Sequence, residues 1–331
     1  MTLKKVAVTV GIDDYRGSPL GGCVNDARAI ATLLSSNDDG SPNFHCVSLL
    51  APRTFTPAEP PLVTRATLRS KLEEILAKKV DMALFYFAGH GTVTPRGGIL
   101  VTQDSTRNDE GVTMAEIVDA ANRSDIQEIT IIVDACFSGR LGGMPSLKDD
   151  YVLLREGVAI VAASLPNEGA AERDQSGVFT SVICGALEGG AADVLGEITS
   201  ASIYAYAEQA LGPLDQRPMY KANVARLSPL RKCRPVVPPE VLRKLKDYFP
   251  TAEYDFPLDP AYEPDHKQHP PGTVPDPGKE ASFADLQKFR DARLLVPVGE
   301  QHLFYAAIRS KSCHLTPLGK FYWRRAKAGL L

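Results

Sequence analysis

The chain has 331 residues, of which 44% are hydrophobic and 23% charged, and its formal net charge is -3. This composition is typical of an ordinary globular protein and gives no reason to expect a strongly basic nucleic-acid binder. No apolar run approaches the roughly 20 residues that a membrane-spanning helix needs. The apolar stretch near the N-terminus is too short for a signal peptide, so we expect a cytoplasmic protein with no membrane partner.

The six cysteines show no metal-binding or redox spacing. They stand at Cys23, Cys46, Cys136, Cys184, Cys233 and Cys313. The absence of any Cys-x-x-Cys pair argues against a zinc site or a thioredoxin-like motif. Five of them are expected to be packing residues, because a free cysteine behaves as a small buried hydrophobe. Cys136 is the exception, and we predict neither a metal nor a cofactor.

The first two thirds of the chain alternate short apolar runs with helical patterns. The apolar runs predict fully buried strands at residues 6–10, 46–50, 83–87, 129–133 and 158–162. The helical patterns cover residues 25–34, 68–77, 114–121, 178–187 and 203–211. This alternation predicts an α/β domain over residues 1–227, with a mostly parallel sheet covered by helices on both faces.

The composition changes after residue 227. Residues 228–281 hold 12 of the 25 prolines, and this density predicts a linker because proline interrupts both helices and sheets. Residues 282–331 form the third predicted segment, a small basic domain. Its expected elements are a helix over 283–293 capped by Ser282, strands over 294–298 and 303–308, and a last helix over 315–328 that begins near Pro317.

Two of the predicted strands end in reactive residues. Residues 88–91 read AGHG around His90, and residues 134–139 read DACFSG around Cys136. Because parallel strands present their carboxyl ends at one rim, neighbouring strands would bring these two side chains face to face. An imidazole can take the proton of a thiol and so produce the nucleophilic thiolate. A lone cysteine or histidine is usually structural, but the joint pattern favours a catalytic pair.

The glycines beside His90 have two expected roles. Gly89 and Gly91 are expected to let the backbone turn sharply around the histidine. The backbone N–H groups near Gly91 and Cys136 could then stabilise the oxyanion of a tetrahedral intermediate.

These residues resemble a known family. Residues 85–91 and 133–139 are similar to the two catalytic blocks of the caspase/metacaspase clan, and residues 11–15 and 21–27 resemble its first block. The resemblance covers about residues 1–225. It implies a caspase-hemoglobinase α/β fold, a dyad of Cys136 and His90, and peptide-bond hydrolysis through an acyl-enzyme.

The resemblance also implies a substrate preference. Metacaspases and paracaspases hold a basic P1 side chain between two aspartates, and the matching positions here are Asp26 and Asp134. Two carboxylates suit a guanidinium, which they can meet bidentately, so we expect cleavage after arginine and, second, after lysine. The alternative is that Asp26 caps a helix and Asp134 caps a turn. Ser164 is a candidate for substrate contact or an ordinary loop serine.

Calcium activation and self-cleavage are two modes of regulation that the sequence leaves open. The calcium-binding aspartates of some metacaspases have no identifiable counterpart, since Asp149 and Asp150 form only a pair, so calcium activation stays open. Self-cleavage after Arg231, Lys232 or Arg234 is one expectation for an arginine-specific enzyme. A solvated linker is the other.

The C-terminal tail, residues 301–331, is basic. It holds six basic residues and no acidic residue after Glu300: Arg309, Lys311, Lys320, Arg324, Arg325 and Lys327. The passage 314–321 resembles the step from wing to last helix in winged-helix domains. Basic winged helices bind DNA or proteins. We favour a regulatory protein as the partner of residues 282–331, with nucleic acid as the second interpretation.

A cysteine phosphatase and a non-catalytic adaptor are the functions that compete with a peptidase. A cysteine phosphatase needs an arginine six positions after its cysteine, but position 142 is Gly142 and Arg140 lies only four positions on. A non-catalytic adaptor of the same fold remains the alternative. By analogy with the clan, an active enzyme would process a protein substrate in a stress, defence or cell-death pathway.

Overall fold

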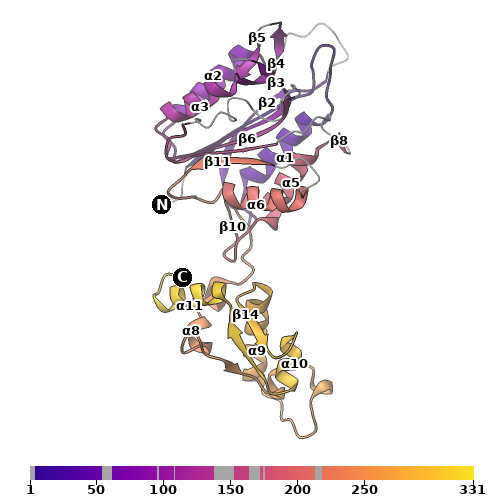
Figure 1. Ribbon diagram of the computed structural model, residues 1–331, viewed down its shortest axis with the longest axis vertical. Coiled ribbons are helices and arrows are strands. Elements are labelled where there is room, and N and C mark those ends of the chain that lie inside the picture. The colour runs from indigo at the N-terminus through magenta and orange to yellow at the C-terminus, as the bar shows by residue number, and fades with distance from the viewer. Residues whose placement is uncertain are drawn as a thin grey trace. The chain divides into compact units, whose positions relative to one another are not determined.

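The chain forms two compact units in this computed structural model, which Figure 1 traces from the N-terminus to the C-terminus. The structure describes residues 4–53, 62–94, 97–107, 109–137, 153–163, 172–173, 176–212 and 218–331. The first unit comprises Met1–Ala192 and Glu197–Cys233, and the second comprises Asp193–Gly196 and Arg234–Leu331.

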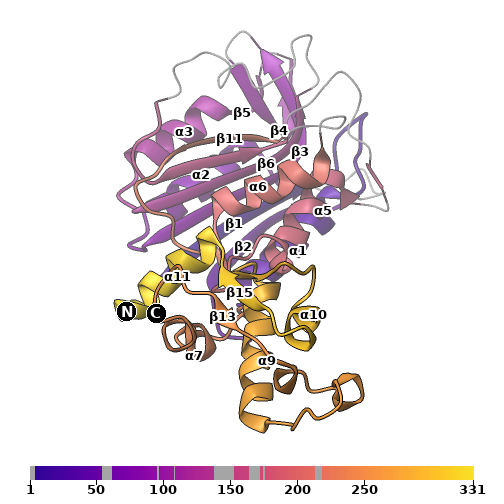
Figure 2. The same ribbon diagram turned by 60° about the horizontal axis from the view of Figure 1, so that its bottom comes forward.

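A mostly parallel sheet organises the first unit (Figures 1 and 2). Its strand order is β11-β7-β6-β3-β1-β2, with β11 antiparallel at one edge and an antiparallel β4–β5 hairpin added to β3. The strands are β1 (Lys5–Ile12), β2 (Phe44–Ala51), β3 (Met82–Thr94), β4 (Gly97–Thr106), β5 (Asp109–Thr113), β6 (Glu128–Phe137), β7 (Val158–Ala162) and β11 (Met219–Asn223). The predicted fold class is confirmed, and a strand occurs at each of the five predicted positions. The expectation of full burial is wrong for β2, which is a partly exposed edge strand. The strands β4, β5 and β11 were not predicted.

Helices cover both faces of this sheet, as predicted. They are α1 (Cys23–Ser35), α2 (Arg65–Leu76), α3 (Met114–Arg123), α5 (Val178–Gly185) with the π-helical turn η1 (Ala186–Gly190), and α6 (Ser200–Leu211). Successive strand residues point to opposite faces. In β1, Val8 therefore packs in the core with Leu68 of α2, while Ala7 packs in the other core with Ile30 of α1.

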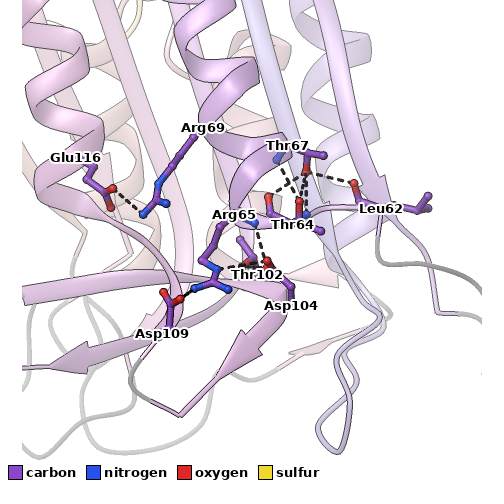
Figure 3. Close-up of polar contacts among 9 residues, drawn as sticks. All are labelled: Leu62, Thr64, Arg65, Thr67, Arg69, Thr102, Asp104, Asp109 and Glu116. Carbon is purple, nitrogen blue, oxygen red and sulfur yellow. Dashed lines mark hydrogen bonds and ion pairs between the residues drawn. The ribbon is translucent and has the colours of Figure 1, made fainter.

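The β4–β5 hairpin is tied to α2 by charged side chains (Figure 3). Thr64 caps α2 by accepting the N–H of Thr67 at 3.1 Å. The next residue, Arg65, pairs with Asp104 at 3.3 Å and also with Asp109, so its guanidinium bridges the two strands of the hairpin. Partly exposed ion pairs add little stability singly, but a guanidinium shared by two carboxylates fixes where the hairpin lies.

The end of the first unit is fixed by a short two-stranded ladder. The remaining short strands of this unit are β8 (Glu172–Arg173), β9 (Ser176–Gly177), β10 (Glu197–Ile198) and β12 (Arg231–Lys232). Arg231 is 8% exposed, and its guanidinium donates to the carbonyl of Leu187 at 2.6 Å. Proteolysis favours exposed, unpaired chain. The expected self-cleavage after Arg231 and Lys232 therefore does not fit the folded unit.

The second unit has its own core around a three-stranded antiparallel sheet of order β13-β15-β14. Its elements are α7 (Pro239–Leu242), α8 (Leu245–Tyr248), β13 (Phe256–Pro257), η2 (Pro260–Tyr262), η3 (His266–Gln268), α9 (Pro277–Asp291), β14 (Leu295–Val298), α10 (Leu303–Ile308), β15 (Ser312–Leu315) and α11 (Pro317–Lys327). None of the helices in the described ranges is long and apolar enough to cross a membrane.

The proline-rich stretch 228–281 is not a linker in this structure. Val237, Leu245 and Phe249 are each 0% exposed and belong to the core of the second unit. Pro239 and Pro277 occupy the first turns of α7 and α9, where the missing N–H of proline costs nothing. The predicted division at residue 281 therefore moves to about Cys233.

Two elements of the predicted C-terminal domain are also different. The helix α9 begins at Pro277 because the side chain of Asp276 accepts the N–H groups of Gly278 and Lys279, and Ser282 lies inside the helix. Residues 303–308 form the helix α10 instead of a strand. The strand β14 consequently pairs with β15, so residues 294–298 and 303–308 do not form the expected pair of strands. The last predicted helix is present as α11.

Candidate active site

The strands that carry His90 and Cys136 are direct neighbours. In the parallel ladder between β3 and β6, His90 is the register partner of Cys136. Neighbouring strands lie about 4.8 Å apart, so the backbone brings the two residues together as the sequence predicted. The Cys136 side chain lies outside the described part of the structure.

The glycines beside His90 do not make a turn. The strand β3 runs without interruption through Gly89, His90 and Gly91 to Thr94, so the expected sharp turn is wrong. Gly89 is needed for space, because a Cβ there would lie 2.5 Å from the hydroxyl oxygen of Tyr15. Gly91 is buried and pairs with Phe137, one position beyond Cys136.

The imidazole of His90 has a defined orientation. Its Nε2 lies 2.7 Å from the carbonyl oxygen of Ser18. A carbonyl oxygen can only accept a hydrogen bond, so we assign the proton of the neutral ring to Nε2. Nδ1 then has a lone pair, which is the state that a general base requires.

The loop between β1 and α1 supplies the contacts to His90. Its first residue, Asp13, accepts the N–H of Cys23 at 2.8 Å and so caps α1. A Cβ at Gly11 would lie 2.3 Å from the carbonyl oxygen of Cys23, which explains why a glycine allows α1 to approach β1. This packing places Asp26 in the first turn of α1, where backbone N–H groups favour a negative charge.

Asp26 and Asp134 converge on the start of α5. The Oδ2 atom of Asp26, a residue only 3% exposed, accepts the N–H of Gly177 at 3.0 Å. The Oδ2 atom of Asp134 accepts the N–H of Thr180 at 3.2 Å and also the Thr180 hydroxyl. A Cβ at Gly177 would lie 2.6 Å from Asp134 Oδ2 and 3.3 Å from Asp26 Oδ2, so both oxygens lie close to one point.

This pair of acids is electrostatically unusual. Burial, together with the charge of Asp26, raises the pKa of Asp134 to about 6, although the hydrogen bonds from Thr180 act in the opposite direction. The hydroxyl of Tyr86 lies 2.5 Å from that of Thr180 and extends the network into the core. Both acids accept backbone N–H groups at the start of α5, and these long-range contacts differ from the helix cap and turn cap of the alternative interpretation. Their convergence nevertheless creates a concentrated negative site.

Other predicted features lie outside the described residues. Ser164 is one of them, and the Asp149–Asp150 pair is another. Within the ranges that the structure describes, no group of three histidine, cysteine or acidic side chains is arranged to hold a metal ion.

Sequence reasoning missed several residues of this site. Tyr15 stood in the block with the family resemblance but received no role, and the Ser18 carbonyl has no sequence signal at all. Thr180 also received no role in the site, although its hydroxyl binds Asp134. A buried hydroxyl next to a carboxylate can be recognised only once the fold is known, because 46 residues separate the two.

Comparisons with known proteins agree with this arrangement. Residues 4–227 match the caspase domain of the Peptidase C14 family. Caspase-1 from Spodoptera frugiperda aligns with a TM-score of 0.51 at 13% identity, over 70% of this chain and 92% of that chain. Protein GSU0716 from Geobacter sulfurreducens aligns with a TM-score of 0.50 at 16% identity, over 70% and 98% respectively. A search of curated proteins found no match. The caspase-like α/β fold is confirmed.

Proposed function

Because the chain belongs to the caspase domain family of cysteine peptidases, we propose that it is an endopeptidase that cleaves after a basic P1 residue, arginine before lysine. The register of His90 with Cys136 is the observation that carries this proposal. This register brings a thiol and an imidazole, the two groups that thiol-based acyl transfer needs, to one position of the sheet.

The chemistry would proceed in two stages. Nδ1 of His90 takes the proton of the Cys136 thiol, and the thiolate attacks the carbonyl carbon of the scissile bond. The backbone N–H groups of Gly91 and Cys136 stabilise the resulting oxyanion. The C–N bond then breaks, His90 returns its proton to the leaving amine, and an acyl-enzyme remains. Water, deprotonated by His90, attacks this thioester and releases the acid and the thiol.

The acid pair supports the preference for arginine. Asp26 and Asp134 place two carboxylates near Gly177, so a guanidinium would find two partners at the same point. A planar guanidinium donates through several N–H groups in fixed directions, whereas a lysine ammonium acts as a point charge. An acidic P1 side chain would be repelled.

The test compares wild-type protein with Cys136→Ala on a peptide library that varies only P1. We expect cleavage after arginine, weaker cleavage after lysine, and none by the alanine variant. The control is Cys46→Ala, which removes a thiol whose pKa burial raises to about 11 and which should therefore contribute nothing. Cleavage that persists in Cys136→Ala would refute the proposal. Absence of all Cys136-dependent cleavage, with calcium and without it, would leave the adaptor alternative.

We further propose that the enzyme works in the cytoplasm on a protein of a stress, defence or cell-death pathway, and that its second unit binds a regulatory protein. Two of the basic residues in the tail have acidic partners: Arg309 pairs with Glu300 at 2.9 Å and Lys320 with Glu253 at 3.6 Å. Such pairing lowers the charge available to phosphates. We expect the full chain to show no salt-dependent DNA binding, and clear binding at low salt would favour nucleic acid instead.

A further inference from the structure

Tyr15 lies against His90 through both its ring and its hydroxyl. The two rings are 4.5 Å apart between centroids and tilted by 51°. The backbone N–H of His90 donates to the Tyr15 hydroxyl at 3.1 Å, and this hydroxyl donates to the carbonyl of Val101 in β4 at 3.0 Å. One phenol therefore joins β3, at the position of the histidine, to the loop that follows β1 and to the neighbouring hairpin strand.

The Tyr15 hydroxyl remains protonated and occupies a defined position. Tyr15 is 6% exposed, and burial raises its pKa well above the usual value, so the hydroxyl keeps its proton and remains a donor to Val101. The absence of a side chain at Gly89 leaves the space that the hydroxyl fills.

The loop that carries Tyr15 is anchored independently of His90. The side-chain Nε2 of Gln103 donates to the carbonyl oxygen of Asp14 at 3.1 Å and to its Oδ2 at 2.9 Å. The Oε1 of Gln103 accepts the N–H of Val63 at 2.8 Å. Gln103 belongs to the strand β4, which Arg65 ties to α2 through Asp104 (Figure 3). The support of Tyr15 is thus a rigid part of the sheet.

We propose that Tyr15 is the positioning residue for His90: its hydroxyl fixes the backbone of the histidine, and its ring holds the imidazole with Nε2 against the Ser18 carbonyl. The kinetic consequence rests on the proposed peptidase function. The structural consequence does not, because the orientation of the ring is a property of the free protein. Loss of this support would let the imidazole leave the Ser18 carbonyl and expose either nitrogen to the thiol.

The kinetic test uses Tyr15→Phe and Tyr15→Leu. The phenylalanine keeps the ring and removes the hydroxyl, and we expect about a tenfold fall in kcat on an arginine peptide; the leucine removes both, and we expect about a hundredfold fall. KM should remain within about twofold, since Tyr15 does not contact the acid pair in the contacts described above. Tyr248→Phe is the matched control, because it removes a phenol that donates to Asp285 at 3.0 Å in the second unit.

A second readout separates this inference from the peptidase proposal. Nitrogen-15 NMR of the His90 ring should show the Nε2–H tautomer in wild type and in Tyr248→Phe, and a mixture of tautomers in Tyr15→Leu, which removes the ring that holds the imidazole. If wild-type protein cleaves no peptide, the peptidase proposal fails while the NMR result still decides the role of Tyr15. An unchanged tautomer in Tyr15→Leu would overturn the inference. So would a fall in kcat that the unfolded fraction, measured by thermal melting, fully explains.

Discussion

Replacing His90 with alanine is expected to lower kcat on an arginine peptide by about 10³-fold, with KM changed by less than about twofold. In the proposed mechanism the imidazole takes the thiol proton before attack and returns it to the leaving amine, so the variant would lack the group that makes both transfers. The proposed substrate pocket is formed by Asp26 and Asp134 near the start of α5, which the substitution leaves in place. The fall should therefore appear in kcat alone.

Alkylation by iodoacetamide provides the measurement that needs no substrate. Cys136 should react rapidly in wild type and slowly in His90→Ala, because only the thiolate is a good nucleophile. Burial raises the pKa of Cys184 and of Cys313 to about 12, so these thiols should stay slow in both proteins. His45→Ala, which removes an exposed histidine from the edge strand β2, is the control. Equal alkylation of Cys136 in wild type and His90→Ala would contradict the dyad.

Replacing Asp134 with asparagine is expected to lower the selectivity for arginine over citrulline at P1 by about 10- to 100-fold. Citrulline has the shape of arginine without its charge, so the ratio of the two kcat/KM values isolates the electrostatic part of recognition. A hydrogen bond to a charged group contributes about 1.5–3 kcal/mol, which corresponds to this range. The amide oxygen of asparagine can still accept the N–H of Thr180, so the fold should be preserved.

The same ratio should depend on pH in wild type. Because the pKa of Asp134 is raised to about 6, the carboxyl gains a proton as the pH falls through 6 and then no longer attracts a guanidinium. The arginine-to-citrulline ratio should therefore fall on acidification in wild type and stay level in Asp134→Asn. Acid has the opposite effect on the stability of the fold in the absence of substrate. The folded state binds the proton of Asp134 more tightly than the unfolded state does, so the contribution of this group to stability is largest at low pH and falls as the pH rises from 3.8 through about 6.

Asp119→Asn is the matched control, since it removes an exposed carboxylate from α3, on the opposite face of the sheet from α1 and α5. Its arginine-to-citrulline ratio should equal that of wild type at every pH. A wild-type ratio in Asp134→Asn would show that the arginine preference, if present, arises elsewhere.

The core strands and the neighbouring positions of His90 and Cys136 could be predicted because their signals are local. The run from Met82 to Phe87 is apolar, as a strand buried on both faces must be, and His90 follows in the same strand three residues later. The hairpin β4–β5 gave no such signal, because its strands mix glycine with polar side chains such as Gln103 and Asp104, whose partners lie in distant segments.

The errors in the second unit have two physical causes. Proline density was interpreted as a linker, yet Pro239 and Pro277 begin helices and Phe249 contributes a fully buried ring. Residues 303–308 were interpreted as a strand because a six-residue apolar run fits either structure. The buried residues Leu303, Ala306 and Ala307 are three and four positions apart, which is the spacing of one face of a helix.

The most direct measurement uses a peptidyl-arginine acyloxymethyl ketone, which alkylates a cysteine only after the arginine has bound. Mass mapping after brief incubation should find one adduct, on Cys136, whose formation slows strongly in His90→Ala and in Asp134→Asn. An adduct on Cys136 that forms equally fast with a P1 aspartate reagent would contradict the basic pocket. No adduct on Cys136, in a protein that melts cooperatively, would contradict the central claim that this chain is an arginine-directed cysteine peptidase.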